Sequence, residues 1–435
     1  MAIKTTTMPL TPEQVQIIKA TVPVLQQHGT AITTQFYKTI LEEHPELNNV
    51  FNHTNQVNNH QAKALAGSLF AYASHIDDLG ALSPAVEKIC HKHASLYIRP
   101  EHYPIVGDGV LRAMKVILGD ACTPEIVDAW AAAYDQLANI FIKREEQLYA
   151  EAGGWTDWRD FKIADKVKES DEITSFYFKP VDGKALPEFL PGQYISVLVD
   201  VPHFGYQQSR QYSLSDAPDP DYYRISVKKE PGADNSPGWI SNILHDDKNV
   251  GDVVKLSHPA GDFFFDPAKD QDGPIVLISA GVGITPMVSI MNTLLQRNSK
   301  QQISSIHGAR STSVQAFADH VRKHTTEKPN LQSVVFIKNP IARKDQQGVH
   351  FHHSSRVDLA KLDQKRDLHL DDNKTKYFVC GPEAFMASMW NGLQSMGVEP
   401  DRIKMEVFGT GDNLVSARFR DCNDHELTYS VMQKS

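Results

Sequence analysis

The sequence has few cysteines and no basic excess. Its four cysteines, Cys90, Cys122, Cys380 and Cys422, are scattered over 435 residues without a C-x-x-C pair or a metal-like spacing. A disulfide scaffold is therefore not expected, and a reducing compartment suits the chain better. The formal net charge of −9 argues against a nucleic-acid partner, because bound phosphates have to be neutralised by basic side chains.

Long apolar runs are also missing. No run approaches the roughly 20 residues that a membrane-spanning helix needs, so we expect no transmembrane segment. The first ten residues, MAIKTTTMPL, have neither the apolar core of a secretory signal nor the arginines of a mitochondrial presequence. A cytoplasmic location is expected, and a mitochondrial one is less favoured.

A chain of this length is expected to form two or three domains. The pattern of apolar and polar residues changes twice along the sequence. Residues 1–152 have the helical apolar period of about 3.6 residues. Thr11-Pro12 and Ser83-Pro84 are typical of helix starts, and Gly153-Gly154 ends this region. We expect an all-α domain here.

The rest of the chain has two further textures. Residues 155–266 contain short β-rich runs, which indicate an antiparallel barrel or sandwich: ITSFYF, QYISVLVDV, YYRISVKK and DVVKLS. In residues 272–435, the apolar strands PIVLISA and YFVCGP are each followed by a glycine loop and a helical pattern. This alternation predicts a doubly wound α/β domain with a parallel sheet.

Two histidines lie close together in the helical region, in EKICHKHASLYI (residues 87–98). On a helix, His91 lies about 200° from His93, so the two point to opposite sides. His93 shares a face with mostly apolar neighbours: Val86, Ile89, Cys90, Leu96 and Tyr97. His91 is expected to be solvated, and His93 is either a hydrogen-bonded core residue or a ligand.

Three further polar side chains fall on apolar faces of predicted helices. Glu145 interrupts the apolar stripe of YDQLANIFIKREEQLY, Gln61 shares a face with Leu65, and Tyr37 lies in QFYKTIL. A buried carboxylate is costly unless it is paired. Each residue alone could lie at a helix edge near solvent. Together with His93, however, they indicate a shared internal ligand.

These segments resemble the globin domain of the flavohemoglobins, whose landmarks QFYKTIL, NNHQAKAL, EKICHKH and IKREEQLY follow in order and spacing. The resemblance implies that His93 is the proximal ligand of haem b iron. Tyr37 and Gln61 would lie on the distal side, where Leu65 shapes the pocket.

The same resemblance assigns three residues behind the haem. Tyr103 and Glu145 would form a hydrogen-bonded relay, and Lys92 would be the family's lysine beside the proximal histidine. A carboxylate that accepts the far N–H of a ligating imidazole makes that imidazole a stronger donor. This favours activation of O₂ over simple carriage, while a tyrosine hydroxyl and an amide can hydrogen-bond partially anionic O₂.

The β-rich region carries PGQY (residues 191–194) and, after a predicted strand, RQYS (residues 210–213). Arginine can pair two phosphate oxygens, tyrosine offers a flat face to a flavin, and a serine hydroxyl can donate to a ring nitrogen. RQYS alone could be a half-buried strand. With GWIS (238–241) and PAGDFFF (259–265), the series resembles the ferredoxin reductase-like flavoproteins. The FAD contacts implied are Tyr194, Arg210, Gln211, Tyr212 and Ser213, with Gly238 and Ser241 near the pyrophosphate at a helix N-terminus.

In the third region, SAGVGITP (residues 279–286) follows an apolar strand. Its glycines would let backbone approach phosphate, Thr285 could cap the next helix, and Pro286 suits a first helical position. With Cys380-Gly-Pro382 at another strand end, it resembles the NAD(P)H domain of the same reductases. The nucleotide contacts implied are Gly281, Val282, Gly283, Ile284, Thr285 and Pro286.

Two residues of this region allow alternatives. Cys380 is either reactive or a small residue that closes a strand. Arg310, which also follows a strand, could meet the 2′-phosphate of NADPH or lie exposed in a loop, so the choice between NADH and NADPH is open.

The segment MEVFGT (residues 405–410) resembles the one that returns to the flavin. By this resemblance, Phe408 covers the ring, and Val407, Gly409 and Thr410 belong to the same FAD-contacting stretch. Glu406, Lys92 and Tyr37 are the residues expected to tune the redox potentials. The family has proline where Thr410 stands and ends soon after, so a C-terminal extension is expected from about residue 411.

The resemblance covers residues 10–410 as three domains in the family's order. It implies a nitric oxide dioxygenase in which NAD(P)H reduces FAD, FAD reduces haem, and NO and O₂ give nitrate. A monomer is expected, and a lipid in the distal haem pocket is left open. The alternatives are a haem-based O₂-binding or sensor protein and an NAD(P)H reductase for another acceptor.

Overall fold

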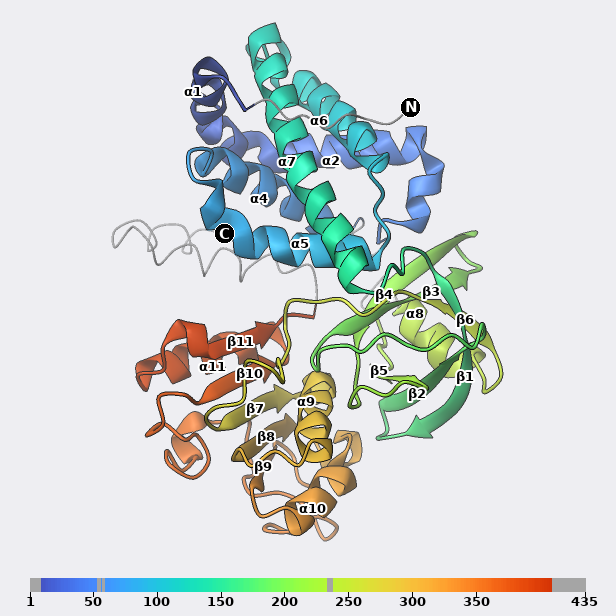
Figure 1. The fold of residues 1–435 in the computed structure, drawn as a ribbon, viewed down its shortest axis with the longest axis vertical. Coiled ribbons are helices and arrows are strands. Elements are labelled where there is room, and N and C mark those ends of the chain that lie inside the picture. Colours follow the sequence, from blue (N-terminus) through green and yellow to red (C-terminus); the bar gives the residue numbers. More distant parts are fainter. Residues whose placement is uncertain (1–8, 53–55, 57–58, 233–237, 409–435) are drawn as a thin grey trace. The chain divides into compact units, whose positions relative to one another are not determined.

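The structure is a computed structural model, and it describes residues 9–52, 56, 59–232 and 238–408. The chain divides into two compact units by its contacts, and Figure 1 labels their helices and strands. The first comprises the described residues of Met1–Ile89 and Arg99–Lys143, together with Phe408. The second comprises the described residues of Cys90–Ile98 and Arg144–Val407. No described helix has the length and apolar character needed to span a membrane.

The first unit is helical, as predicted. It contains α1 (Pro12–Ala20), α2 (Val22–Glu43), α4 (His60–Ser74), α6 (His102–Leu118), the first parts of α5 (Ser83–Ser95) and α7 (Pro124–Glu151), and the short 3₁₀ turns Pro45–Asn49, Leu79–Leu82 and Gly119–Ala121. Thr11 caps α1 as predicted, since its hydroxyl accepts from the Gln14 N–H while the Gln14 side chain accepts from the Thr11 N–H.

Close helix packing in this unit depends on two glycines of α6. A Cβ on Gly107 would lie 2.6 Å from the Tyr134 ring, and one on Gly109 would lie 2.9 Å from the Phe36 ring. These glycines therefore let α6 approach α7 and α2 closely. Phe36 is almost fully buried in the apolar core of the unit.

The ends of α5 and α7 belong to the second unit. Helix α5 stops at Ser95, because Tyr97 adopts a left-handed φ of 54°. The prediction that Leu96 and Tyr97 continue the helical face is therefore wrong, because both residues lie beyond the end of the helix. Helix α7 ends at Glu151 and is followed by the Gly153-Gly154 pair with positive φ, as predicted.

An antiparallel sheet follows. Its strands are β1 (Arg159–Lys168), β2 (Ile173–Pro180), β3 (Tyr194–Val201), β4 (Tyr206–Ser213), β5 (Tyr223–Lys228) and β6 (Val253–Leu256). Their order is β4-β3-β6-β1-β2-β5, and a bridge between Leu214 and Ile225 joins its two edges. The predicted antiparallel barrel is thus confirmed. Helix α8 (Trp239–Asn242) and the π-helical turn Ile243–Asp247 lie between β5 and β6 in the chain.

The last part is a five-stranded parallel sheet, also as predicted. Its elements are β7 (Ile275–Ala280), α9 (Ile284–Gln296), β8 (Ile303–Ala309), α10 (Ala318–Glu327), β9 (Leu331–Ile337), β10 (Lys376–Cys380), α11 (Glu383–Ser395) and β11 (Ile403–Glu406). The strand order is β11-β10-β7-β8-β9. The order reverses between β7 and β10, and that is where doubly wound sheets bind their ligands.

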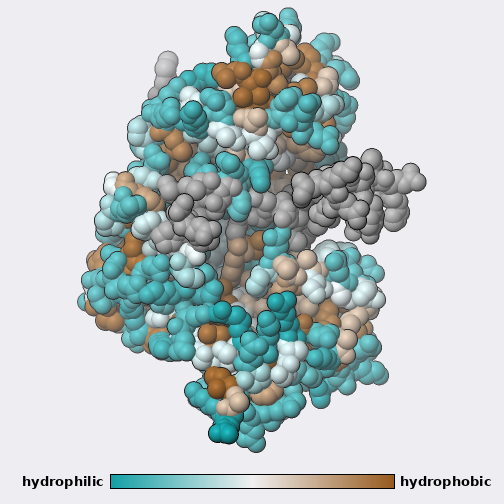
Figure 2. Space-filling view, turned by 180° about the vertical axis from the view of Figure 1, so that it is seen from behind, coloured by the Kyte–Doolittle hydropathy of each residue, from teal (hydrophilic) through white to brown (hydrophobic). Residues whose placement is uncertain are grey.

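Large exposed apolar side chains are few among the described residues: Val116, Val167, Val181, Val250, Val253, Val349 and Phe408. On the face drawn in Figure 2, hydrophilic residues predominate and apolar residues form separated groups. The apolar side chains are mostly used in the three cores, one helical, one in the barrel and one in the α/β part.

Candidate functional site

The second unit brings His93, near the end of α5, against Glu145 of α7. His93 Nδ1 lies 2.9 Å from Glu145 Oε1. Glu145 is 2% exposed, whereas the His93 side chain is 30% exposed. A carboxylate bound to Nδ1 favours the tautomer with its proton there and its lone pair on Nε2, the nitrogen that would bind a metal. The predicted pairing of a buried acid with this histidine is present.

His91 corrects one prediction. It is buried, not solvated, with 7% exposure, and its Nδ1 accepts a hydrogen bond from the Gly261 N–H at 3.0 Å. The helical geometry separates the two histidines as expected. The side of α5 that carries His91, however, packs against residues of the PAGDFFF loop instead of facing water.

A second contact joins the segment after α5 to the residue that precedes this loop. The Tyr97 hydroxyl accepts a hydrogen bond from the His258 N–H at 3.1 Å, and the Tyr97 ring lies near those of Tyr149 and Trp158. Lys92, between the two histidines, is partly buried. The chain segment that carries His93 is thus fixed to the barrel.

Tyr37 and Gln61 come together in the first unit. Tyr37 lies on α2 with 8% exposure, and its hydroxyl is hydrogen-bonded to the Gln61 side chain. Burial raises the pKa of Tyr37 well above its usual value, partly offset by the Gln61 contact. Gln61 also accepts from Gln56 Nε2 at 2.8 Å, and Leu65 follows one turn later on α4, partly buried. The Tyr37 hydroxyl therefore stays protonated and can donate.

Tyr103, the other residue of the predicted relay, lies near the start of α6 in the first unit and is 6% exposed. Its carbonyl accepts a hydrogen bond from the Tyr134 hydroxyl at 2.9 Å. Because Glu145 belongs to the second unit, the relay between Tyr103 and Glu145 stays a prediction.

RQYS lies within a strand, as its last four residues, and not after one. Strand β4 pairs with β3 in register, so that Tyr194 faces Ser213, and Arg210 faces Val197. The two tyrosine motifs PGQY and RQYS are therefore neighbours in the sheet. Ser213 is 7% exposed.

Alternation along β4 separates the side chains of RQYS into two sets. Arg210 and Tyr212 share a face, where burial lowers the pKa of the Arg210 guanidinium and raises that of the Tyr212 hydroxyl. Gln211 lies on the other face, where its Nε2 donates to Ser196 Oγ at 3.2 Å. Arginine and tyrosine on one face are the groups that a flavin pyrophosphate and ring would need.

Gly238 and Ser241 lie at the start of α8, as predicted. The Ser241 hydroxyl donates to the Gly238 carbonyl at 2.9 Å and accepts from the Glu230 N–H at 3.1 Å. A Cβ on Gly238 would lie 2.7 Å from Glu230 atoms. Glycine is therefore required at this position, and Ser241 holds the turn together.

The predicted nucleotide loop, Gly281–Gly283, passes directly beside the end of β10. A Cβ on Gly283 would lie 2.3 Å from the Cys380 carbonyl oxygen, and Gly281 has a φ of +56°. Gly283 is thus needed because a side chain would not fit there, and Gly281 is needed because of its backbone conformation. Gly281 is exposed and Val282 is partly exposed, so the loop presents its backbone at the β7–β10 reversal.

The start of α9 differs from the prediction. The helix begins at Ile284, so Pro286 is its third residue. The Thr285 hydroxyl donates to the Val282 carbonyl at 3.0 Å and does not cap the helix. Ile284, Thr285 and Pro286 are all buried, so they support the loop from beneath.

Cys380 is fully buried, and burial raises the pKa of its thiol well above the usual value. It therefore closes a strand, and the reactive alternative is not supported. Glu406 faces Cys380 in the β10–β11 register, and its charge adds to the effect of burial in raising the pKa values of Cys380 and Tyr194. Glu406 is thus close to residues of both predicted cofactor sites.

The predicted flavin-covering segment is described only in part. Val407 is partly buried, and Phe408 is 45% exposed. Gly409, Thr410 and the extension from about residue 411 lie outside the described residues.

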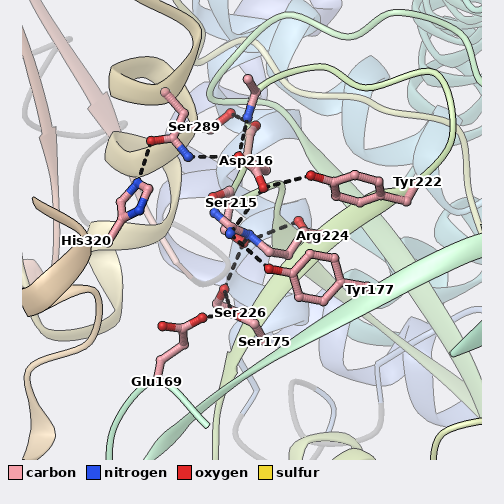
Figure 3. A network of polar contacts seen from close by, with 12 residues as sticks. Glu169, Ser175, Tyr177, Ser215, Asp216, Tyr222, Arg224, Ser226, Ser289 and His320 are labelled. Carbon is pink, nitrogen blue, oxygen red and sulfur yellow. Dashed lines mark hydrogen bonds and ion pairs between the residues drawn. The ribbon is translucent and has the colours of Figure 1, made fainter. Parts of the chain in front are cut away.

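A buried polar network was missed (Figure 3). Arg224 of β5, 7% exposed at its side chain, pairs with Asp216 at 3.1 Å. The Asp216 carboxylate accepts from Asn292 of α9 at 2.7 Å, and Asn292 also contacts His320 of α10 at 2.8 Å. The network therefore joins the barrel to the α/β part. An arginine inside the β-rich run YYRISVKK was the available signal.

Comparisons with known proteins agree with this architecture. Residues 34–141 match the globin family, and residues 277–390 match the oxidoreductase NAD-binding domain family. The chain is 47% identical over 408 residues to the flavohemoprotein of Bordetella parapertussis, which covers 92% of this chain and 99% of that protein. It is 45% identical over 404 residues to the flavohemoprotein of Rhizobium meliloti, covering 92% and 98%.

Solved structures give the same result. A flavohemoglobin crystal structure from Malassezia yamatoensis with bound FAD and haem has a TM-score of 0.80 and 27% identity, and it covers 92% of this chain and 100% of that one. The FAD/NAD binding domain of a nitric oxide dioxygenase from Vibrio cholerae has a TM-score of 0.52 and 36% identity, covering 58% and 99%. With these relatives over nearly its whole length, the chain belongs to the flavohemoprotein family.

Proposed function

We propose that this flavohemoprotein is a nitric oxide dioxygenase that oxidises NO to nitrate with O₂ and NAD(P)H. The observation that carries the proposal is the contact between His93 and the buried Glu145. Simple O₂ carriage does not need a buried acid behind the ligating imidazole, whereas O₂ activation gains from the electron density that the acid provides. The Vibrio cholerae structure, named a nitric oxide dioxygenase, supports the same activity.

The residues present fit FAD and haem, which the Malassezia structure holds, and a nicotinamide nucleotide, which the match to the NAD-binding domain family indicates. His93 offers one imidazole with its second nitrogen bound to an acid, which would suit a ligand of haem iron. Arg210 and Tyr212 offer the groups for FAD, and the loop that begins at the exposed Gly281 offers backbone for NAD(P)H. When bound, these groups would supply hydride donation, conversion of the hydride into single electrons, and an iron at which O₂ and NO could react.

Under this proposal the chain's own residues have separate tasks. Glu145 holds the His93 ring and keeps the proton at Nδ1. Tyr37 and Gln61 donate hydrogen bonds to O₂ as negative charge develops on it. One hydride serves two molecules of NO and two of O₂, since six electrons from NO and two from the hydride reduce two O₂ completely. Lys92 and Glu406 are proposed to tune the potentials.

The test is Glu145→Gln, with Glu146→Gln as its matched control. Glu146 is the next residue and is exposed, so its replacement removes the same charge without touching His93. We expect NO consumption with NADH and O₂ to fall by about 10- to 100-fold in Glu145→Gln and to be unchanged in Glu146→Gln. Absorbance spectra would show that both variants hold haem.

Unchanged NO consumption in Glu145→Gln would contradict the assigned role of the acid. If the wild-type protein, loaded with haem and FAD, is reduced by NADH but does not consume NO, the activity itself is wrong. A reductase for another acceptor would then be indicated. If NADH does not reduce the haem within turnover time, an O₂-binding or sensor protein would be indicated instead.

A further inference from the structure

An arginine directly follows the strand next to the predicted nucleotide loop, Gly281–Gly283. β7 carries the Gly281–Gly283 loop, β8 is its parallel neighbour, and Arg310 directly follows β8. In doubly wound dinucleotide sites, an acid near this place binds the ribose 2′-hydroxyl of NAD, while an arginine accommodates the 2′-phosphate of NADP. Taken by itself, Arg310 would predict NADPH.

The structure gives this arginine an acidic partner from another part of the chain. Arg310 Nη2 forms an ion pair with Glu172 Oε1, although the two residues are 138 positions apart. Glu172 immediately precedes β2 of the barrel. A carboxylate therefore stands at the nucleotide edge of the α/β sheet, supplied by the barrel.

Glu172 is held in place by its neighbours on both sides. The Asp171 N–H donates to the Ser313 carbonyl at 2.9 Å, which ties the turn to the loop after β8. Ile173 is 2% exposed and packs in the core of the α/β part. The Glu172 carbonyl also accepts from the Lys229 N–H at 2.8 Å. The position of this carboxylate is thus set by backbone bonds and core packing.

The hydroxyl groups after Arg310 are also engaged within the chain. The Thr312 hydroxyl bonds the Asp345 carboxylate at 2.9 Å, and the Ser311 and Ser313 hydroxyls lie 3.1 Å apart. A 2′-phosphate would therefore have to displace a carboxylate from Arg310 and approach a second one at Asp345. A 2′-hydroxyl would meet no such repulsion and could donate to Glu172.

Stability does not explain the Glu172–Arg310 pair. The Arg310 side chain is 68% exposed, and exposed ion pairs contribute little to folding. We propose that Glu172 makes this flavohemoprotein select NADH over NADPH, by occupying Arg310 and repelling a 2′-phosphate. The proposal rests on the proposed function only in that the chain uses a nicotinamide nucleotide.

The experiment compares NADH and NADPH as donors for full-length, FAD-loaded protein with ferricyanide as the acceptor. This assay involves neither NO nor O₂, so its outcome is separate from that of the dioxygenase test. We expect wild type to favour NADH. Glu172→Gln keeps the shape but removes the charge, and it should raise kcat/KM for NADPH by about tenfold or more while NADH changes less than about threefold.

Two further variants complete the test. Asp182 lies beyond the other end of β2 and pairs with Arg159 at 2.7 Å. Asp182→Asn removes this carboxylate, and it should leave the ratio of kcat/KM for NADH to that for NADPH unchanged. Adding Arg310→Gln to Glu172→Gln should abolish the gain with NADPH.

Inhibition by 2′,5′-ADP, compared with 5′-AMP, measures 2′-phosphate binding without hydride transfer. It should strengthen in Glu172→Gln. Two outcomes would overturn the proposal. One is a wild type that prefers NADPH, and the other is a Glu172→Gln variant whose nucleotide ratio and 2′,5′-ADP inhibition match those of wild type.

Discussion

Replacement of Arg224 by methionine should destabilise the reductase part of the chain strongly. Arg224 and Asp216 lie 3.1 Å apart, with side-chain exposures of only 7% and 18%. The guanidinium also donates to the Ser215 hydroxyl at 3.2 Å (Figure 3). It lies over the Phe317 ring, 5.3 Å from the ring centroid. Methionine would keep much of the volume but remove the charge and its donors.

The magnitude follows from the burial of the pair. At an effective dielectric constant of about 20, two unit charges this close attract by about 5 kcal/mol. Removal of one partner from a buried pair typically costs about 3–5 kcal/mol, because the other charge is left uncompensated. Asp216 would keep its hydrogen bonds from Asn292 and Tyr222. We therefore expect the lower end of that range, about 3 kcal/mol.

Calorimetry of the full chain measures this cost as a fall in the melting temperature of the second unit, which contains the barrel and the α/β part. For a part of about 250 residues, 3 kcal/mol corresponds to a fall of about 6–12 °C. Lys255→Met is the matched control, since Lys255 and Asp160 pair at 2.9 Å in the same barrel but are 44% and 52% exposed. The control should cost less than about 1 kcal/mol.

A second change tests whether the charge is the cause. Asp216→Asn keeps a hydrogen-bonding side chain but needs no counter-ion, so its addition to Arg224→Met should recover part of the loss. The reasoning is refuted if Arg224→Met lowers the transition no more than Lys255→Met does. It is also refuted if the double variant is less stable than Arg224→Met alone.

Two further predictions concern the α/β part. Gly283→Ala places a Cβ 2.3 Å from the Cys380 carbonyl and should destabilise the protein by about 1–3 kcal/mol and raise KM for NADH. Gly67→Ala, at an exposed position of α4 with open space around it, should instead stabilise the protein slightly, and equal effects in calorimetry would contradict the steric argument. Burial lowers the pKa of His307 to about 4, below its unfolded value, so its contribution to stability is present above pH 6.5 and is lost as pH falls towards 4. His307→Gln should make the melting temperature fall less steeply over this range, and an unchanged slope would argue against the assignment.

The sequence predicted the three architectures because each has its own apolar period. Four strands of the barrel were recognised from their β-rich runs. Two were not: β1 (RDFKIADKVK) and β4 (YQQSRQYS) are rich in charged or polar residues. They are strands because their neighbours in the sheet satisfy their backbone groups, and that information is not local. The position of RQYS was wrong for the same reason.

Residues buried by distant parts of the chain were also mispredicted or missed. The spacing of Glu145 on an apolar stripe correctly indicated burial. Helical spacing placed His91 on the side opposite His93, but it could not show that Gly261, 170 positions away, contacts that side. Glu172 is an ordinary charged residue in sequence, and no local pattern pairs it with Arg310. A helical period reports which residues share a face, and only the folded chain shows what that face meets.

The division of the chain into units bears on the proposed electron path. The end of α5 is held in the second unit by three contacts: Glu145 to His93, the Gly261 N–H to His91, and the His258 N–H to Tyr97. The imidazole proposed to bind iron therefore belongs to the same compact unit as the strands that carry Arg210 and Tyr212. Tyr37 and Gln61, the proposed partners of O₂, belong to the other unit. Substitutions on α2 and α4 thus change a unit that does not contain His93, Arg210 or Tyr212.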